Sequence, residues 1–404
     1  MANHKRKSGI ELELRKVESK LKKDAEALGL SYDPVYFDLA TPEELNEIAA
    51  FGLPNRYVHW SFGAQYKNLD VMEKTKQMHI YELVLNSKPV YAKLSTENNF
   101  QENVMVMAHV LGHADIFYNN KDYINTNKDM VNIASENVLL IDKLRKNYHR
   151  ETIDSYLTAL MSIAKCSMNT FQFPDKKKHS LFYMLYDNAS KEIYEQQLFE
   201  IVKQESEYFD VIFRTQFINE GWAQFIETKL LDKHFSLSDW LDFAASCSMR
   251  PGPYQIGHAI YSSIDEKYGF GKCLEVRKFY DDIAFIQEFL TQELVDKLQL
   301  GIQKKDKSID NKVDSVIAKI IDDKKTMNVP QIIGERIRYD RNKKLFLSFY
   351  EEEGKKLETG NRLQMYMKQI YLLWKDDIHL IIYDETKKPC SSWLYDSTNK
   401  LRKL

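Results

Sequence analysis

The segment NVMVMAHVLGHADIF, residues 103–117, decides how the centre of this chain folds. Apolar residues occupy most of its positions over a length that suits a helix better than a strand, so we expect a buried helix. His109 and His113 are four residues apart and therefore lie one above the other on one helix face. An unpaired buried polar group costs about 1–3 kcal/mol. The segment therefore predicts either a metal ion shared by the two imidazoles or a hydrogen-bond network around them.

The composition is that of a globular protein with high helical content. Of 404 residues, 44% are hydrophobic and 29% are charged, with only 14 glycines and 9 prolines. The 57 basic and 59 acidic residues leave a formal net charge of -2. This balance argues against a strongly basic surface over the whole chain, so we expect no nucleic-acid partner. No stretch of about 18 uninterrupted apolar residues is present, so we expect no membrane span.

Cysteine usage and the first residues indicate a cytoplasmic protein. The cysteines lie far apart without a CxxC pair, which predicts reduced thiols rather than a disulfide framework or a zinc knuckle. The start of the sequence lacks the apolar core of a secretory signal. The cysteines are Cys166, Cys247, Cys273 and Cys390.

The patterns around the central segment predict a mainly helical α+β protein. Residues 9–29 carry apolar side chains at helical spacing, and Thr41 supplies a cap for a second helix. Residues 80–85 alternate like a strand, and residues 88–92 extend or pair with it. Helical patterns then dominate from about residue 98 to residue 300.

We expect a domain boundary near residue 328. Residues 304–325 are charge-rich and predict a helical connector. The sequence beyond them predicts a small β-β-α-β domain with strands at 336–339, 344–350 and 378–383 and a helix at 361–375. We therefore divide the chain into a domain of residues 1–327 and a C-terminal domain of residues 328–404. The C-terminal domain holds no cluster of titratable residues, so packing or binding of a protein partner is its expected role.

A second segment, Asn219-Glu-Gly-Trp-Ala223, adds a carboxylate to the candidate site. It lies in the helical run 211–231, where Glu220 is costly to bury unless it is paired or metal-bound. Gly221 allows another helix to approach closely. A buried salt bridge of Glu220 is the simpler alternative to a metal.

Two histidines on one helix and a glutamate on a later helix are the ligand set of a broad class of zinc hydrolases, which keep a fourth position for water. The sequence therefore predicts a zincin-like helical domain with a small mixed sheet, in which His109, His113 and Glu220 hold zinc. The same set suits ferrous iron, which is the alternative metal.

The usual general base of such peptidases is absent, because Val110 follows the first histidine where they carry a glutamate. A base would have to come from Glu82, Asp115 or Glu136. Asp115 lies about 200° around the helix from His113, so we expect it to support the helix from behind.

Three further segments supply candidates for substrate handling. Tyr254 and His258 share a face if a helix begins near Pro253, and such a pair can donate hydrogen bonds to a developing oxyanion. Packing at a helix start explains them equally well. His59 and Trp60, in an aromatic cluster, line a substrate groove or simply pack in the core. The candidate strand containing Glu82, followed by Asn86, would align an extended substrate by edge pairing.

Several of these segments together resemble the SpoVR family (stage V sporulation protein R). The matching motifs are Tyr57-x-His-Trp-Ser-Phe-Gly63, Tyr81-Glu-x-Val-x-Asn-Ser-x-Pro89, Ala108-His-x-x-Gly-His-x-Asp-x-Phe-x-Asn-Asn120, Asn219-Glu-Gly-Trp-Ala223 and Pro253-Tyr-x-x-Gly257. The resemblance covers nearly the whole chain. It implies a cytoplasmic bacterial protein linked to spore cortex formation or, in other bacteria, to stress physiology, without a settled activity. The sequence departs from the family pattern at Ala64, where lysine is usual, and at residues 243–249, which lack a usual histidine.

The sequence thus favours a zinc-dependent hydrolase that acts on an amide bond in a peptide or a peptidoglycan-type substrate. Two alternatives remain open: a ferrous-iron enzyme, and a non-catalytic assembly or regulatory protein. The valine at position 110 favours the second of these.

Overall fold

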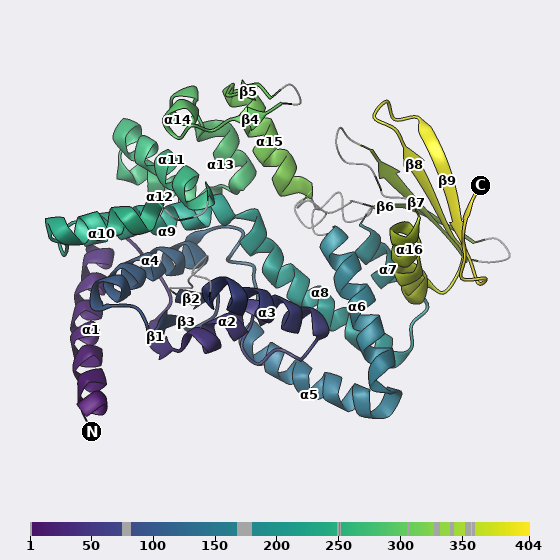
Figure 1. Ribbon diagram of the computed structural model, residues 1–404, viewed down its shortest axis with the longest axis horizontal. Coiled ribbons are helices and arrows are strands. Elements are labelled where there is room, and N and C mark those ends of the chain that lie inside the picture. The colour runs from purple at the N-terminus through teal and green to yellow at the C-terminus, as the bar shows by residue number, and fades with distance from the viewer. Residues whose placement is uncertain are drawn as a thin grey trace. The chain divides into compact units, whose positions relative to one another are not determined.

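The computed structural model describes residues 2–74, 82–167, 180–248, 250, 252–304, 307–326, 332–339, 343–351, 357 and 360–404. The protein is mainly helical with small mixed sheets, which confirms the expected α+β class (Figure 1). Over the described ranges, no helix combines the length and the apolar character that crossing a bilayer requires.

The chain forms two compact units, residues 1–138 with 211–320, and residues 139–210 with 321–404. The chain therefore passes between units within three helices, α5 (Met130–Tyr148), α8 (Ile193–Arg214) and α15 (Val313–Thr326). The predicted boundary at residue 328 follows a different division, and independent folding of residues 328–404 stays a prediction.

The first unit contains a three-stranded sheet and the helices that carry the candidate site. Its other elements are α1 (Ala2–Ala27), β1 (Val35–Ala40), α2 (Pro42–Phe51), α3 (Trp60–Lys74), β2 (Glu82–Leu85), β3 (Val90–Ser95), α4 (Phe100–Asn119), α9 (Gln216–Leu231), α10 (Leu237–Ser248), α11 (Gly252–Tyr268), α12 (Phe270–Phe279), α13 (Asp282–Phe289), α14 (Gln292–Lys297), β4 (Ile302–Gln303) and β5 (Ile309–Asp310).

The sheet of the first unit has the strand order β1-β3-β2, with β1 parallel and β2 antiparallel to β3. The predicted pairing of the two segments after residue 80 is confirmed, with Glu82 opposite Leu94. The sequence analysis missed β1, although its apolar residues alternate along the strand. Helix α4 packs against all three strands, so the sheet supports the histidine helix from one side.

Helix boundaries follow the local capping signals. Thr41 caps α2 through a capping box with Glu44, as its sequence indicates, and Asn99 and Glu102 form the same motif at the start of α4. Residues 103–117 of α4 are all buried, which confirms the expectation for this segment. The helix expected at residues 9–29 begins earlier and ends at Ala27.

Three helices pack tightly because small residues lie where they cross. A Cβ atom on Gly112 of α4 would lie 2.7 Å from Ala223 Cα of α9. A Cβ on Gly221 of α9 would lie 2.4 Å from Gly257 Cα of α11, which confirms the close approach expected at Gly221. The backbones of α4 and α9 therefore run side by side (Figure 1). Side chains of α9 can thus reach the histidines of α4.

The second unit combines helices with a five-stranded sheet of order β10-β9-β8-β7-β6, in which β7 and β8 are parallel. Helix α16 connects β7 to β8 and packs on one face of the sheet, where Tyr371 contacts Tyr395 of β9 and Trp374 lies under Lys343 of β7. Leu345, Leu347 and Leu380 on this face are buried. Its elements besides α5, α8 and α15 are α6 (Arg150–Ser167), α7 (Leu181–Asn188), β6 (Ile333–Tyr339), β7 (Lys343–Tyr350), α16 (Asn361–Trp374), β8 (Ile378–Tyr383), β9 (Pro389–Tyr395) and β10 (Leu401–Lys403).

The structure extends one prediction for the last hundred residues and corrects another. The β-β-α-β order is present, and β9 and β10 continue the sheet. The sequence analysis missed β9 because its first half, Pro389-Cys-Ser-Ser392, lacks the apolar alternation of a strand. The helical connector expected at residues 304–325 was partly wrong, because β4 and β5 pair before α15 begins at Val313.

Candidate metal centre

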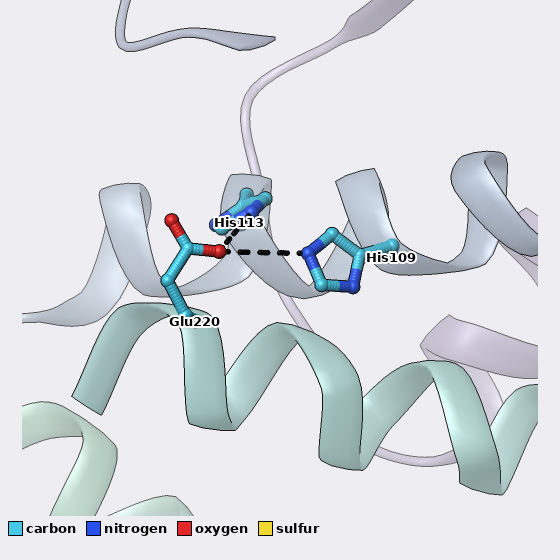
Figure 2. Close-up of side chains that lie close together, drawn as sticks. All are labelled: His109, His113 and Glu220. Carbon is cyan, nitrogen blue, oxygen red and sulfur yellow. Dashed lines mark ion pairs between the residues drawn. The ribbon is translucent and has the colours of Figure 1, made fainter. Parts of the chain in front are cut away.

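His109 and His113 on α4 and Glu220 on α9 lie together inside the first unit (Figure 2). The Glu220 Oε2 atom is 3.3 Å from His113 Nε2 and 3.7 Å from His109 Nε2. Two ligand atoms of a tetrahedral site with bonds of about 2.1 Å lie about 3.4 Å apart. Both distances from Glu220 are near this value, and the three ligand atoms lie within 4.8 Å of one another. The two distances also suit direct ion pairs between the carboxylate and the imidazoles.

The second nitrogen of each imidazole is held by a side chain of α9. His109 Nδ1 lies 3.0 Å from Glu227 Oε2, and His113 Nδ1 lies 2.9 Å from Asn219 Oδ1. Because both partners are hydrogen-bond acceptors, the Nδ1 atoms donate and the Nε2 atoms face Glu220. A metal-ligating histidine is typically oriented in this way, with its other nitrogen bonded to a carboxylate or carbonyl oxygen.

Two atoms at the centre of the cluster are buried without a hydrogen-bond partner among the described residues: His109 Nε2 and Glu220 Oε2. They face one another at a distance too long for a hydrogen bond. A buried polar atom that is left unpaired calls for an explanation such as an ion. The donor set and the missing hydrogen bond at these two atoms are compatible with a divalent metal, and the ion pairs with Glu220 are the alternative without one.

The two carboxylates of the cluster lie beside imidazole rings and a guanidinium group. Burial raises the pKa of Glu220, but the imidazoles of His113 and His109 outweigh it and lower that pKa well below its ordinary range. Burial also raises the pKa of Glu227, but Arg250 and His109 lower it to about 2. In His109, burial lowers the pKa, while Glu220 and Glu227 raise it to about 9. Both carboxylates are therefore ionised at neutral pH, and an ion that binds Nε2 of His109 must displace a proton.

Arg250 connects this cluster to the start of α11. Its guanidinium binds Glu227 through two hydrogen bonds, of 2.6 Å to Oε2 and 3.0 Å to Oε1. The Tyr254 ring lies 5.8 Å from the His109 ring at an interplanar angle of 19°, and Arg250 lies over the same tyrosine ring. The structure therefore places Tyr254 beside the candidate ligands.

The anchoring roles of Asn219, Glu227 and Arg250 were not predicted from the sequence. A signal for Glu227 was present, because it follows Glu220 by seven residues, two helical turns, and so shares its face. No local pattern marks Arg250 as its partner, since the contact joins residues of different elements.

His258 lies on α11 and faces a different part of α9. Its Nε2 atom is 3.4 Å from Thr228 Oγ1, and its ring packs near Phe225. Burial lowers the pKa of His258, so the ring is neutral at neutral pH. Glu227 and Arg250 also act on the charge of this ring, so His258 lies near the cluster without contacting its proposed ligands, and its role in catalysis stays a prediction.

Asp115 is fully buried on the far side of α4 and joins several elements. It accepts hydrogen bonds from the Ser31 backbone at 2.9 Å, Trp222 Nε1 at 2.9 Å and Asn119 Nδ2 at 3.0 Å, and Arg277 Nε lies 2.9 Å from its Oδ2. As its helical position indicates, Asp115 supports α4 from behind. Both of its oxygens have partners within the protein, and a role of Asp115 as a base stays a prediction.

The remaining candidates are placed as follows. Glu82 lies in β2, and its side chain is outside the described part of the structure. Glu136 is exposed on α5. Asn86, just after β2, is buried, donates to Thr126 Oγ1 and accepts from Lys128 Nζ. Its amide is thus engaged within the protein.

The aromatic cluster before α3 is partly core and partly surface. His59 is buried, with Nδ1 2.7 Å from Ser61 Oγ and its ring against Phe62. Trp60 is 66% exposed. Only Trp60 of this pair presents a large surface to a ligand.

Comparison with known proteins gives a family match and one distant relative. The family described as SpoVR like protein matches residues 10–179 and 165–338. The chain is 23% identical over 350 residues to the uncharacterized protein YcgB of Escherichia coli (strain K12), covering 65% of this chain and 69% of the relative. No solved structure matches the chain.

Proposed function

The chain belongs to the SpoVR family, and on this premise we propose that it is a metal-dependent hydrolase with a zincin-like centre. One observation carries the proposal. Two Nε2 atoms and a carboxylate oxygen converge at a buried point, while the opposite nitrogen of each ring is held by an acceptor on α9. This arrangement orients both imidazoles for a shared ion rather than for solvent.

Zinc is the metal that we propose for His109, His113 and Glu220. Two imidazoles and one carboxylate bind zinc and leave a fourth position open in catalytic sites. Ferrous iron, which takes the same ligand types, is the second candidate. The bound metal would supply a Lewis acid that polarises a carbonyl group and lowers the pKa of water.

The residues around the cluster suit the positioning of ligands and substrate. Glu227, locked by the two hydrogen bonds from Arg250, fixes the orientation of His109. We assign to Tyr254 the donation of a hydrogen bond to the developing oxyanion, because its ring lies against His109. β2 lies at an edge of its sheet, where an extended substrate can add as a further strand.

The general base cannot come from position 110, because Val110 is buried and carries no ionisable group. Among the alternatives, Asp115 is occupied by its partners and Glu136 is exposed on α5. We keep Glu82 as the candidate base, to be tested by Glu82→Gln, which should lower turnover without removing the metal.

An amide bond in a peptide or peptidoglycan-type substrate is the proposed target, because an edge strand recognises an extended backbone. A cytoplasmic role in spore cortex formation is part of the same proposal and rests on the family resemblance. The valine at position 110 favours a second candidate function, a non-catalytic assembly or regulatory protein. In that case a fourth protein ligand would fill the coordination position that a catalytic site leaves to water.

Elemental analysis of protein purified without chelators tests the metal. We expect about one zinc per chain in the wild type and a large loss in Glu220→Gln. The matched control is Asp232→Asn, an exposed carboxylate directly after α9, which should retain zinc. One iron per chain would favour the ferrous alternative. A stoichiometric metal in Glu220→Gln, or none in the wild type, overturns the ligand assignment.

Hydrolysis is tested separately on the zinc-loaded protein, with peptides and peptidoglycan fragments as substrates. Release of new amino groups that is lost in Glu220→Gln supports the enzyme. X-ray absorption that finds four protein ligands and no water, together with absent turnover, would instead support the non-catalytic function.

A further inference from the structure

The sheet of the second unit has one face that α16 does not bury. Leu345, Leu347 and Phe349 of β7 are buried on the side of α16. Because successive side chains of a strand alternate between faces, Phe346 and Tyr350 point to the opposite side. Tyr350 is 38% exposed. Phe346, and His379 and Tyr383 of the neighbouring β8, are partly exposed, whereas Ser348 between Phe346 and Tyr350 is buried. The aromatic positions of this second face are therefore accessible to a ligand.

Aromatic rings gather on that face at the two central, parallel strands. Phe346 of β7 stacks with His379 of β8 at 4.9 Å, and Tyr350 stacks with Tyr383 at 4.8 Å. We call these four residues the aromatic face. Burial and the nearby Lys344 lower the pKa of His379, so its ring is a neutral aromatic at neutral pH. The two pairs lie four residues apart along each strand, about 13 Å, and form two successive aromatic positions.

Cations flank the aromatic face at one end. Arg336 and Arg338 of the edge strand β6 lie over the Phe346 ring, with their guanidinium carbons at 5.1 and 5.2 Å from its centre. Both arginines are exposed, and in the described part of the chain neither forms an ion pair with a carboxylate. Lys344 of β7 stands opposite Arg338. Glu335, bonded to Ser348, and Asp377, which acts on His379, offset part of this charge.

We propose that the aromatic face, with Arg336, Arg338 and Lys344, binds single-stranded nucleic acid. Unpaired bases stack on aromatic side chains while cations follow the phosphates, and some sheets bind RNA through aromatics on their central strands. The net charge of -2 describes the whole chain and includes acidic residues outside the aromatic face. It is therefore compatible with a local group of cations that binds phosphates. A purely apolar protein partner would leave the two arginines without a counter-charge, so the charge favours the nucleic acid.

Fluorescence anisotropy of the full chain with labelled oligouridylate and oligothymidylate of about 12 nucleotides tests the proposal. We expect binding to single strands to exceed binding to a duplex of the same length. A plot of the logarithm of the binding constant against the logarithm of the salt concentration should have a slope of about -2, as expected for three phosphate contacts. Tyr350→Ala should weaken binding about tenfold. The double variant Arg336→Ala/Arg338→Ala should flatten the salt slope to about -0.7.

The chain offers a matched control in the first unit. Tyr36 and Tyr91 are exposed and stack across neighbouring strands at 6.1 Å, but the adjacent Lys93 is paired with Asp38. Tyr36→Ala/Tyr91→Ala should leave oligonucleotide binding unchanged. Circular dichroism verifies that each variant is folded.

Three results would overturn the proposal. The first is no binding of either oligonucleotide at low salt, and the second is equal binding of single strands and duplex. The third is self-association detected by sedimentation that Tyr350→Ala abolishes while no oligonucleotide binds, which would make the face a protein interface. The metal content plays no part in these measurements, so the outcome is independent of the proposed hydrolase.

Discussion

Glu227 Oε2 accepts a hydrogen bond from Nδ1 of His109 at 3.0 Å, on the side of the imidazole ring opposite Glu220. One helix, α9, thus supplies both the proposed metal ligand and the group that orients the neighbouring ligand. Seven residues separate the two glutamates, so they project from the same face of α9 toward α4. The geometry of the cluster therefore depends on how closely α4 and α9 approach.

The substitution Glu227→Gln should weaken zinc binding about 10- to 100-fold. The glutamine amide oxygen can still accept a hydrogen bond from His109. The substitution removes the negative charge that lies beside the His109 imidazole and pairs with Arg250. Competition with a chromogenic chelator measures the affinity. Glu136→Gln, an exposed change on α5, is the control and should bind zinc like the wild type. An unchanged affinity in Glu227→Gln would show that the anchor is dispensable.

The substitution Gly112→Ala should destabilise the protein by about 1–3 kcal/mol and reduce its metal content. The new Cβ would lie 2.7 Å from Ala223 Cα, so α4 and α9 would have to separate. Urea unfolding measures the stability. In the control Gly63→Ala, on α3, the new Cβ meets nothing within 4 Å, so its unfolding free energy should stay equal or rise slightly. Equal stability of both variants would contradict the close packing.

Removal of the metal with a chelator should lower the unfolding temperature of the wild type. A ligand present at 100 times its Kd stabilises the native state by about 2.7 kcal/mol, and that contribution is lost with the ion. The Glu220→Gln variant should unfold at the same temperature with and without chelator, as measured by differential scanning calorimetry. If the chelator shifts that variant as much as the wild type, the metal is bound elsewhere.

The pH dependence of stability should change in Lys128→Met. Burial lowers the pKa of Lys128 to about 8, with Asp33 opposing and Lys88 adding to the shift. Between pH 8 and about 10.4, Lys128 therefore holds its proton more often in the unfolded chain than in the folded protein. The destabilisation caused by burying the charged lysine decreases as the pH rises through this range. The stability of the wild type relative to Lys128→Met should increase by about 2 kcal/mol or less from pH 8 to pH 10. Urea unfolding at each pH tests this, and a flat difference would disprove it.

Much of the local structure followed from short-range signals. The capping residues Thr41 and Asn99 begin helices where the chain has the matching glutamates three residues later. The spacing of His109 and His113 placed both rings on one helix face, and the apolar neighbours of Glu220 in the sequence indicated a partner or an ion. These are properties of neighbouring residues, and helix periodicity is sufficient to derive them.

The sequence by itself determined which side chains could share a face, and the tertiary structure decided which faces meet. The anchoring of His109 by Glu227 and Arg250, the engagement of Asp115 by Arg277 and the contact of Tyr254 with the imidazole all join separate elements. Such contacts depend on how helices rotate and cross, which the close packing at Gly112 and Gly221 constrains. Helix periodicity carries no information about the rotation of one helix relative to another, so these partners became visible only in three dimensions.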